Sequence, residues 1–146
     1  MISIAKVNDV DRIYSLSSSL ITDPQLSKDD ILRYVDDKNI LMLVLQDGEM
    51  IIGYSIIRLS IDEAEIDEIG IDKNYQGKGY GKTLLKEVEH QLYQRGIKRV
   101  LLEVREKNLT AISLYKKSGY QIYKRREKYY LDDNALCMHK EIKDEG

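Results

Sequence analysis

The stretch AEIDEIGIDKNYQGKGYG, residues 64–81, decides how this chain folds. Its first half predicts a β-strand over Ala64–Asp72, and its second half, Gln76–Gly81, holds three glycines that mark a tight turn. After the glycines, apolar residues recur at helical spacing and predict a helix over Tyr80–Arg95, which Gly96 ends as the residue after its C-cap. The stretch therefore predicts a strand joined to a helix through a glycine turn.

The sequence on both sides of this unit predicts further strands and helices. Asp47-Gly48 between two apolar runs is a strong hairpin signal, and Ser27-x-x-Asp30 has the form of a capping box at a helix start. The predicted strands are Ile2–Val7, Ile40–Gln46, Met50–Leu59, Ala64–Asp72, Lys98–Arg105, Tyr120–Lys124 and Lys128–His139. The predicted helices are Val10–Leu20, a short one from Ser27, Tyr80–Arg95 and Asn108–Ser118. The order β-α-α-β-β-β-α-β-α-β-β predicts a mixed α/β fold with helical crossovers between the middle strands.

Length and composition restrict the classes of protein to which the chain can belong. With 146 residues, 42% hydrophobic and 33% charged, we expect one globular domain over 1–146. The net charge of −2 provides no general positive field, so we expect neither a nucleic-acid partner nor attraction to an anionic membrane. Both a monomer and a homodimer are compatible with this sequence.

The location and metal content are predicted from other features. The longest strongly apolar run, Ile40–Leu45, is much shorter than the about 20 residues that span a bilayer, and the first residues lack a secretory signal. Cys137 is the sole cysteine, which excludes an internal disulfide. His90 and His139 lie near no group of cysteines or carboxylates at metal-ligand spacing. We therefore expect a cytoplasmic protein without a metal.

The glycine turn fits one of three phosphate-binding patterns. A P-loop would need glycine where Gln76 stands, although Gly81-Lys82-Thr83 supplies its second half. A dinucleotide fingerprint would need a different glycine spacing, with glycine at position 82. The pattern Gln-x-x-Gly-x-Gly remains, and its backbone N–H groups at a helix start could hold a diphosphate. The alternative is a strand-to-helix turn that binds nothing.

These residues and those that follow resemble a known enzyme superfamily. Residues 64–81 look like the acetyl-CoA-binding segment of the GNAT acetyltransferases, and LLEVREKNLTAISLYKKSGY, Leu101–Tyr120, resembles their RimI-type branch. Lys128-Tyr129-Tyr130, Asp133-Asn134-Ala135-Leu136 and Met138 resemble the ending that RimI shares with archaeal N-terminal acetyltransferases. The resemblance covers about Ala64–Lys140, over half of the chain. It implies the GNAT fold, a twisted, mostly antiparallel mixed sheet flanked by helices, and acetyl-CoA as the acetyl donor.

The same resemblance implies which residues bind the cofactor. The pyrophosphate would be held by Gln76, Gly77, Lys78, Gly79, Tyr80, Gly81 and Lys82, and the strand residues Ile69, Gly70 and Ile71 would lie along the pantetheine and the thioester. Asn108 matches an asparagine that contacts the cofactor arm, and its position also suits a helix N-cap. Tyr115 matches a tyrosine at the cofactor sulfur. A phenol stays protonated at pH 7, so Tyr115 suits the role of general acid.

Acetyl transfer to an amine needs a base, and three carboxylates are candidates. Period-two alternation places Val100, Leu102 and Val104 on one face of their strand and Glu103 on the other. Glu103 matches the glutamate that is the base in RimI enzymes, whereas a solvated glutamate paired with Arg105 is the structural alternative. Glu65 matches the catalytic glutamate of histone-type GNAT enzymes, and Glu68 stands beside it. Because GNAT strands commonly bulge here, parity does not decide which of the two faces the cleft.

Tyr129 and Tyr130 are predicted to line the substrate N-terminus. At most one of them should face the cleft unless the strand bulges, because adjacent strand residues point to opposite sides. The basic run Lys124–Lys128 is predicted to be a solvated part of the hairpin, and contact with the cofactor's phosphate or with a substrate backbone is the alternative. Tyr120 stands where relatives often carry Phe, so it is predicted to pack in the core.

The sequence thus predicts an acetyl-CoA-dependent N-acetyltransferase that acts on protein N-terminal α-amines by direct transfer in a ternary complex. RimI enzymes characteristically acetylate the N-terminal alanine of a small-subunit ribosomal protein. A polyamine or a lysine side chain is the alternative acceptor, because Glu65, Asp67 and Glu68 would suit a cation. A non-catalytic acyl-CoA-binding module is the alternative of another class, and the joint presence of Glu103, Asn108 and Tyr115 counts against it.

Overall fold

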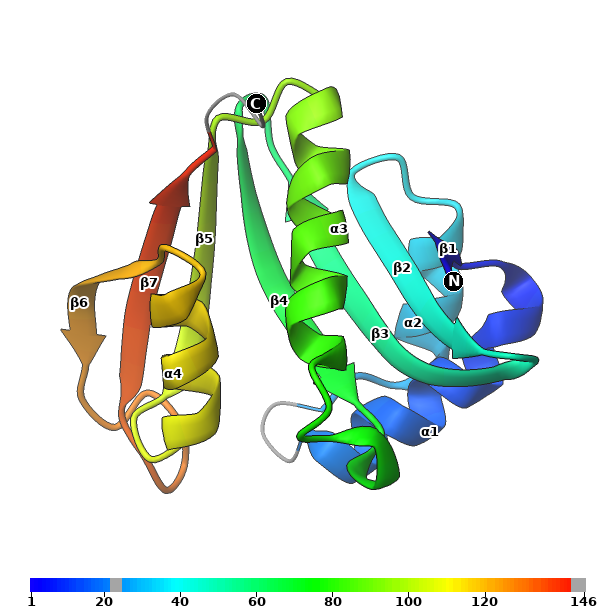
Figure 1. Ribbon diagram of the computed structural model, residues 1–146, viewed down its shortest axis with the longest axis horizontal. Coiled ribbons are helices and arrows are strands. Elements are labelled where there is room, and N and C mark those ends of the chain that lie inside the picture. Colours follow the sequence, from blue (N-terminus) through cyan, green and yellow to red (C-terminus); the bar gives the residue numbers. More distant parts are fainter. Residues whose placement is uncertain (22–24, 143–146) are drawn as a thin grey trace.

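The computed structural model of the protein describes residues 1–21 and 25–142. The described part forms a seven-stranded sheet in the order β1-β2-β3-β4-β5-β7-β6 (Figure 1). The strands are β1 (Ile2–Ile4), β2 (Ile40–Asp47), β3 (Met50–Leu59), β4 (Glu63–Ile71), β5 (Arg99–Arg105), β6 (Gln121–Arg126) and β7 (Ala135–Glu141). Neighbouring strands are antiparallel except β4 and β5, which are parallel. The predicted mixed, mostly antiparallel sheet is confirmed.

Helices cover both faces of this sheet (Figure 1). The helices are α1 (Val10–Leu20), α2 (Lys28–Val35), α3 (Tyr80–Gln94) and α4 (Leu109–Lys117), with short 3-10 turns η1 (Val7–Asp9) and η2 (Lys73–Tyr75). On one face, Ile13 of α1 and Ile31 of α2 are fully buried against β2 and β3. On the other face, α3 and α4 share a core with alternate residues of β2, β4, β5 and β7. Strand β2 is buried on both faces, which explains its uninterrupted apolar sequence.

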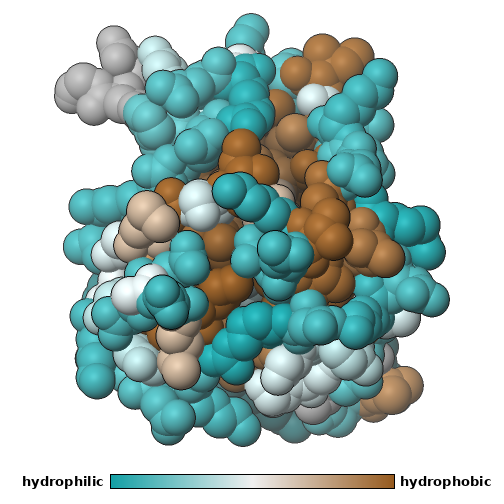
Figure 2. Space-filling model, turned by 90° about the vertical axis from the view of Figure 1, so that its right-hand side faces the viewer, coloured by the Kyte–Doolittle hydropathy of each residue, from teal (hydrophilic) through white to brown (hydrophobic). Residues whose placement is uncertain are grey.

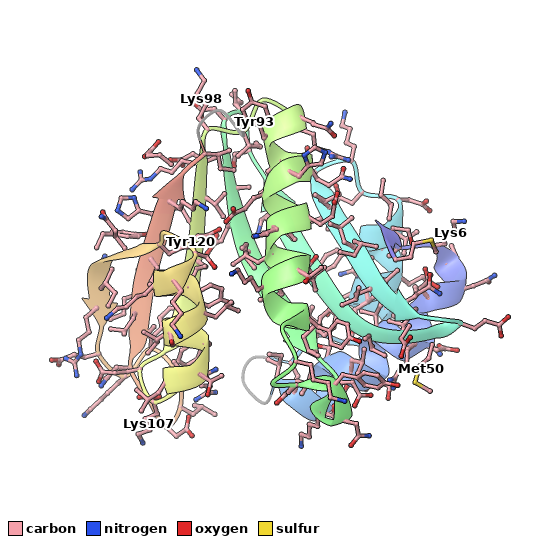
Figure 3. All side chains as sticks on the ribbon, in the orientation of Figure 1. Lys6, Met50, Tyr93, Lys98, Lys107 and Tyr120 are labelled. Carbon is pink, nitrogen blue, oxygen red and sulfur yellow. The ribbon has the colours of Figure 1, made fainter. Side chains whose placement is uncertain are left out.

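The two halves of the sheet separate between β4 and β5. The register pairs Glu63–Ile66 with Arg99–Leu102, and β4 then continues to Ile71 without further pairs to β5. Figure 1 shows the two strands together at the end where β5 begins and apart toward the start of α4. In Figure 3, Lys98 and Tyr93 mark the closed end and Lys107 marks the open end. The sheet therefore opens between β4 and β5 beyond their last pair, Ile66 and Leu102.

A β-bulge in β4 sets which carboxylates share one face. In the ladder with β3, Ile66 pairs with Ile57 and Glu68 pairs with Ile56, so Asp67 is an extra residue without an opposite partner. Without the bulge, Glu65 and Glu68 would point to opposite faces. With it, both lie on the face covered by α1 and α2, while Ile69 packs on the α3 side.

Two predicted strand boundaries were wrong by three residues or more. Strand β1 stops at Ile4 rather than Val7, because Val7–Asp9 turn into η1, and the Asp9 carboxylate accepts a hydrogen bond from the Lys6 amide at 2.9 Å. Strand β7 begins at Ala135 rather than Lys128. The intervening residues form a loop, and Asn134 Oδ1 accepts a hydrogen bond from the Lys128 amide at 2.8 Å.

The outer edge of the sheet at β1 remains apolar. Figure 2 shows this side of the molecule with a band of hydrophobic residues between hydrophilic ones. Ile4 of β1 is 53% exposed, and Val7 of η1 is 56% exposed.

Candidate active site

A cavity of about 430 Å³ lies where β4 and β5 separate. Its walls come from β4, β5, α4, the end of α1, α2 and the loop between β6 and β7. The cavity brings together the predicted residues Glu65, Glu68, Ile69, Glu103, Asn108, Tyr115, Tyr129 and Tyr130. The turn residues predicted to hold the pyrophosphate, and Gly70 and Ile71, are not part of its lining.

The glycine turn before α3 has the geometry of an anion site. Gly77 and Gly79 have φ of +77° and +90°, and an added Cβ at either would meet nothing within 4 Å, so the turn is open to an approaching group. The first N–H groups of a helix lack intrahelical partners, and α3 begins directly after Gly79. Gln76 Nε2 donates to the Ile71 carbonyl at 2.9 Å and ties the turn to the end of β4. The turn thus fits a diphosphate.

Strand β4 offers one edge to a ligand beyond its last pair with β5. Ile69, Gly70 and Ile71 pair with Ser55, Tyr54 and Gly53 of β3 on one side only. An extended ligand could add to the other edge through backbone hydrogen bonds. A Cβ at Gly70 would lie 2.8 Å from the Tyr54 ring, so only glycine fits there.

Glu103 lies on the separated part of β5 and faces the side opposite α3 and α4. The predicted alternation is confirmed, because Val100, Leu102 and Val104 are in the core. Glu103 Oε1 is 3.5 Å from the Arg126 guanidinium and 3.8 Å from the Cys137 thiol. A hydrogen bond to Glu103 raises the pKa of the Tyr129 hydroxyl. This carboxylate is therefore held by groups from the β6–β7 hairpin.

Arg105, the partner considered for Glu103 in the sequence, makes other contacts. It forms an ion pair with Asp132, and its guanidinium lies 4.3 Å from the centre of the Tyr130 ring. Arg105 therefore fixes the loop that carries both tyrosines.

Glu65 lies nearer the closed end than Glu103. It pairs in register with Leu101, before the strands separate. Its carboxylate is 3.9 Å from Arg58, whose guanidinium is closer to Asp67 at 2.7 Å. Burial, and then the charge of Asp67, raise the pKa of Glu65.

Glu68 is buried and bound by two hydroxyl groups. Its Oε1 accepts hydrogen bonds of 2.7 Å from both Ser17 of α1 and Tyr54 of β3, and only 8% of the residue is exposed. Burial raises the pKa of Glu68, against the opposite effect of the two hydrogen bonds. This carboxylate therefore links α1 to the sheet beside the cavity.

We expect Glu68→Gln to flatten the pH dependence of stability. Because the folded state raises the pKa of Glu68, it holds this proton more tightly than the unfolded chain does. The free energy of unfolding therefore falls as the pH rises from the ordinary value of 4.5 through the raised one. Glutamine is neutral and keeps the acceptor oxygen. In urea denaturation, the free energy of unfolding should therefore fall less between pH 5 and pH 7 in this variant than in wild type.

Glu68→Leu is the contrasting variant, because it leaves two buried hydroxyl groups unpaired and should cost about 1–3 kcal/mol. An unchanged pH dependence in Glu68→Gln would contradict this interpretation.

Tyr115 faces the cavity from α4. It is only 7% exposed, and its ring meets the Tyr120 ring edge-on at 5.7 Å. Burial raises the pKa of its hydroxyl, so it stays protonated at neutral pH. Asn108 begins the same helix, and its Oδ1 accepts a hydrogen bond from the Ala111 amide at 3.1 Å, which confirms the predicted N-cap.

Tyr129 and Tyr130 both line the cavity, so the prediction that at most one would do so was wrong. The alternation of a strand does not apply to them, because they lie in the loop before β7. Asp133 shapes this loop, since its carbonyl accepts from the Tyr130 amide at 3.0 Å. The two rings meet edge-on at 5.2 Å and form one aromatic wall.

Sequence reasoning missed several residues of the site. Arg126 was assigned to a solvated run, and Tyr34 and Arg58 were not considered, yet Tyr34 and Arg58 line the cavity and Arg126 contacts Glu103. Leu20, Ile21 and Leu26 add an apolar wall from the end of α1 and the residues before α2. None of them carries a motif, because they meet only through the fold.

Within the described ranges, no group of three or more His, Cys, Asp and Glu residues could hold a metal ion. No helix in those ranges is both long and apolar enough to cross a membrane.

Comparison of the sequence and the fold with known proteins identifies the family of this chain. The sequence profile of the Acetyltransferase (GNAT) family matches residues 8–120, well over half of the chain. The chain belongs to the GNAT acetyltransferase family. This GNAT chain is 30% identical over 135 residues to a Bacillus subtilis (strain 168) protein, covering 91% of this chain and 89% of that one.

Several similar proteins are named as N-acetyltransferases of a ribosomal protein. A Haemophilus influenzae protein named [ribosomal protein bS18]-alanine N-acetyltransferase is 39% identical over 103 residues, 67% of this chain and 70% of its own. The crystal structure of the Escherichia coli ribosomal-protein-S18-alanine N-acetyltransferase has a TM-score of 0.90 at 27% identity, over 100% of this chain and 96% of that one. Ard1 from Thermoplasma volcanium shares the fold, with a TM-score of 0.90 at 24% identity. The match covers 99% of this chain and 98% of Ard1. The predicted resemblance to the RimI-type branch is confirmed.

Proposed function

We propose that this GNAT enzyme, with residues 1–146 as one catalytic domain, transfers acetyl from acetyl-CoA to the α-amine of a protein N-terminus in the cytoplasm. The observation that carries the proposal is that Glu103 and Tyr115 line one cavity from opposite sides of the separated strands. The relatives named as bS18-alanine N-acetyltransferases support an acceptor that begins with alanine and belongs to a ribosomal protein.

Acetyl-CoA supplies an activated acetyl thioester. The glycine turn Gln76–Lys82 would bind its pyrophosphate through backbone N–H groups, and the single-sided edge of Ile69–Ile71 would hold its extended arm. Amides at this edge would also donate to the thioester carbonyl oxygen, where negative charge develops. Structures of GNAT neighbours with acetyl-CoA or with coenzyme A support this donor.

Glu103 would remove the proton from the acceptor, and Tyr115 would supply one to the departing sulfur. An α-amine has a pKa of about 7.7–8.0 against about 10.4 for lysine, so at pH 7 its deprotonation costs about 1–1.4 kcal/mol rather than about 4–5 kcal/mol. A carboxylate base is sufficient for that smaller cost. Cys137 is fully buried, and burial raises the pKa of its thiol, so it is not poised as an acyl carrier. Transfer would be direct.

A small cationic amine is the second candidate acceptor. Glu65, Asp67 and Glu68 lie along β4 at the cavity, and the charge of Asp67 contributes to the raised pKa of Glu65. A polyamine would relieve this excess of negative charge.

The deciding experiment measures thiol release from acetyl-CoA with peptides that start with Ala, Ser or Met, with an internal-lysine peptide and with spermidine. We expect the alanine-starting peptide to give the highest kcat/KM. Preference for spermidine would overturn the N-terminal assignment, and no release with any amine would favour a non-catalytic acyl-CoA-binding module.

The glycine turn can be tested with a matched pair of variants. Gly79 before α3 and Gly96 after it have φ of +90° and +81°, and neither has an atom within 4 Å of an added Cβ. Alanine at either position should cost about 1–2 kcal/mol of stability, because both need a left-handed backbone. We expect only Gly79→Ala to weaken coenzyme A binding, by about tenfold, in isothermal titration calorimetry. Equal affinities of the two variants for coenzyme A would show that the turn does not bind the cofactor.

A further inference from the structure

Strand β6 supplies a cation to the proposed base because its ladder is interrupted. Ile122 pairs with Met138, but the next paired residue is Lys124, which is opposite Cys137, so Tyr123 is a bulge residue. Residues opposite each other in a ladder lie on the same face, and Glu103 pairs with Cys137 on the other side of β7. Lys124 and, two residues later, Arg126 therefore share the face of Glu103.

The bulge determines which of two adjacent arginines meets the base. Regular alternation from Ile122 would place Arg125 on the Glu103 face and Arg126 on the α4 face. With Tyr123 inserted, Arg126 Nε lies 3.5 Å from Glu103 Oε1. Arg125 instead forms an ion pair of 2.6 Å with Glu106.

Arg126 also contacts the aromatic wall of the cavity. Its guanidinium lies 5.4 Å from the centre of the Tyr129 ring, and Tyr129 itself hydrogen-bonds Glu103. Arg126, Tyr129 and Glu103 thus form one connected group between β6, the β6–β7 loop and β5. The side chain of Glu103 is 19% exposed and that of Arg126 is 43% exposed, so the carboxylate is the more buried member of the pair.

We propose that Arg126 is a positioning residue for Glu103, which it holds directed toward the acceptor amine. This inference rests on the proposed role of Glu103 as the base. In the reaction the Glu103 carboxylate takes one proton from the α-ammonium and becomes neutral, and the free amine forms the new N–C bond. The C–S bond breaks, its electron pair leaves with the sulfur, and the sulfur takes a proton from Tyr115. The second proton that nitrogen loses returns to Tyr115 through solvent, and the proton on Glu103 is released to solvent. A nearby cation favours the charged form of a carboxylate, so removal of that cation disfavours it. The pair contributes little to stability, because exposed ion pairs are worth about 0–1 kcal/mol.

The test compares Arg126→Gln with Arg125→Gln, which removes the same charge from the same strand but on the opposite face. For the alanine-starting peptide we expect Arg126→Gln to lower kcat about tenfold at pH 7, with a smaller change in KM. The acid limb of the kcat profile should move to higher pH, because removal of the cation disfavours the charged carboxylate. The kcat of Arg125→Gln should stay within about twofold of the wild-type value. Arg126→Lys keeps the positive charge, so its kcat and the position of its acid limb should be close to those of wild type. Equal behaviour of the two glutamine variants would overturn the proposal, as would a fall in kcat without a shift of the limb.

A second measurement does not depend on turnover. In protein with ¹³C-labelled glutamate carboxyl groups, NMR follows the titration of Glu103, whose resonance is assigned by its absence in Glu103→Gln. The midpoint should be higher in Arg126→Gln than in wild type or Arg125→Gln, and equal midpoints would overturn the proposal. Failure of the wild type to acetylate any N-terminal peptide would overturn the proposed function instead, and the NMR comparison would still decide whether Arg126 acts on Glu103.

Discussion

Glu103→Gln is expected to lower kcat/KM for an alanine-starting peptide by about 10²–10⁴, the range in which a general base contributes. Glutamine keeps the size of the side chain and an acceptor oxygen for Tyr129, so the aromatic wall and the β5–β7 pairing should persist. It cannot take a proton from the ammonium. The loss should therefore appear in kcat, while the affinity for coenzyme A and the melting temperature stay close to those of wild type.

The rival carboxylates make this result decisive. Glu65 lies on the paired part of β4, and the Oε1 of Glu68 is bound to Ser17 and Tyr54. We expect Glu65→Gln to lower activity far less than Glu103→Gln does, in steady-state assays at pH 7. Near-normal turnover by Glu103→Gln, together with a large loss of activity in Glu65→Gln or Glu68→Gln, would show that the general base is a carboxylate of β4.

The sequence was sufficient to predict the features that depend on local order. Alternation in β5 predicted the face of Glu103, because a strand without a bulge keeps its period of two. The capping box at Ser27 and the cap at Asn108 were also predicted correctly, since both involve atoms within one turn of chain. The glycine turn before α3 is local in the same sense.

Features that depend on two bulges could not be read from the sequence. The extra residue in β4 turns Glu68 toward Ser17, and the extra residue in β6 turns Arg126 toward Glu103. Each bulge is defined by the partner strand, whose register is set by the whole sheet. The Tyr129–Tyr130 wall was mispredicted for a related reason, because the loop is shaped by Asp133, whose carboxylate also accepts from the distant Lys107 amide at 2.9 Å.

Tyr120 does more than replace a phenylalanine in the core. Because relatives often carry Phe at this position, the sequence predicts packing alone. Tyr120 is buried as predicted, but its hydroxyl donates to Glu89 of α3 at 2.8 Å, and Lys140 of β7 forms an ion pair with the same carboxylate at 2.8 Å. Figure 3 shows Tyr120 near the end of α4. Its polar end thus joins α3 to β7, in the half of the sheet on which α4 and its Tyr115 pack.

Tyr115→Phe is expected to lower kcat by about 10²-fold, at the lower end of the range for a general acid. Removal of the hydroxyl leaves the ring and its edge-on contact with Tyr120, so the core should keep its packing. Because burial raises the pKa of Tyr115, its hydroxyl is protonated throughout the working range, and its loss should reduce kcat by a similar factor at every pH from 6 to 9. That flat response differs from the shifted acid limb expected when Glu103 is perturbed.

The measurement is the kcat profile with saturating acetyl-CoA, accompanied by thermal denaturation and by coenzyme A titration. Tyr130→Phe is the comparison variant, because Tyr130 lines the same cavity and burial raises its pKa to about 12, yet it belongs to the acceptor wall. Loss of its hydroxyl should raise KM for the peptide more than it lowers kcat. If Tyr115→Phe altered KM and left kcat intact, the proton for the departing sulfur would have to come from solvent, and Tyr115 would serve only to pack α4 against the cavity.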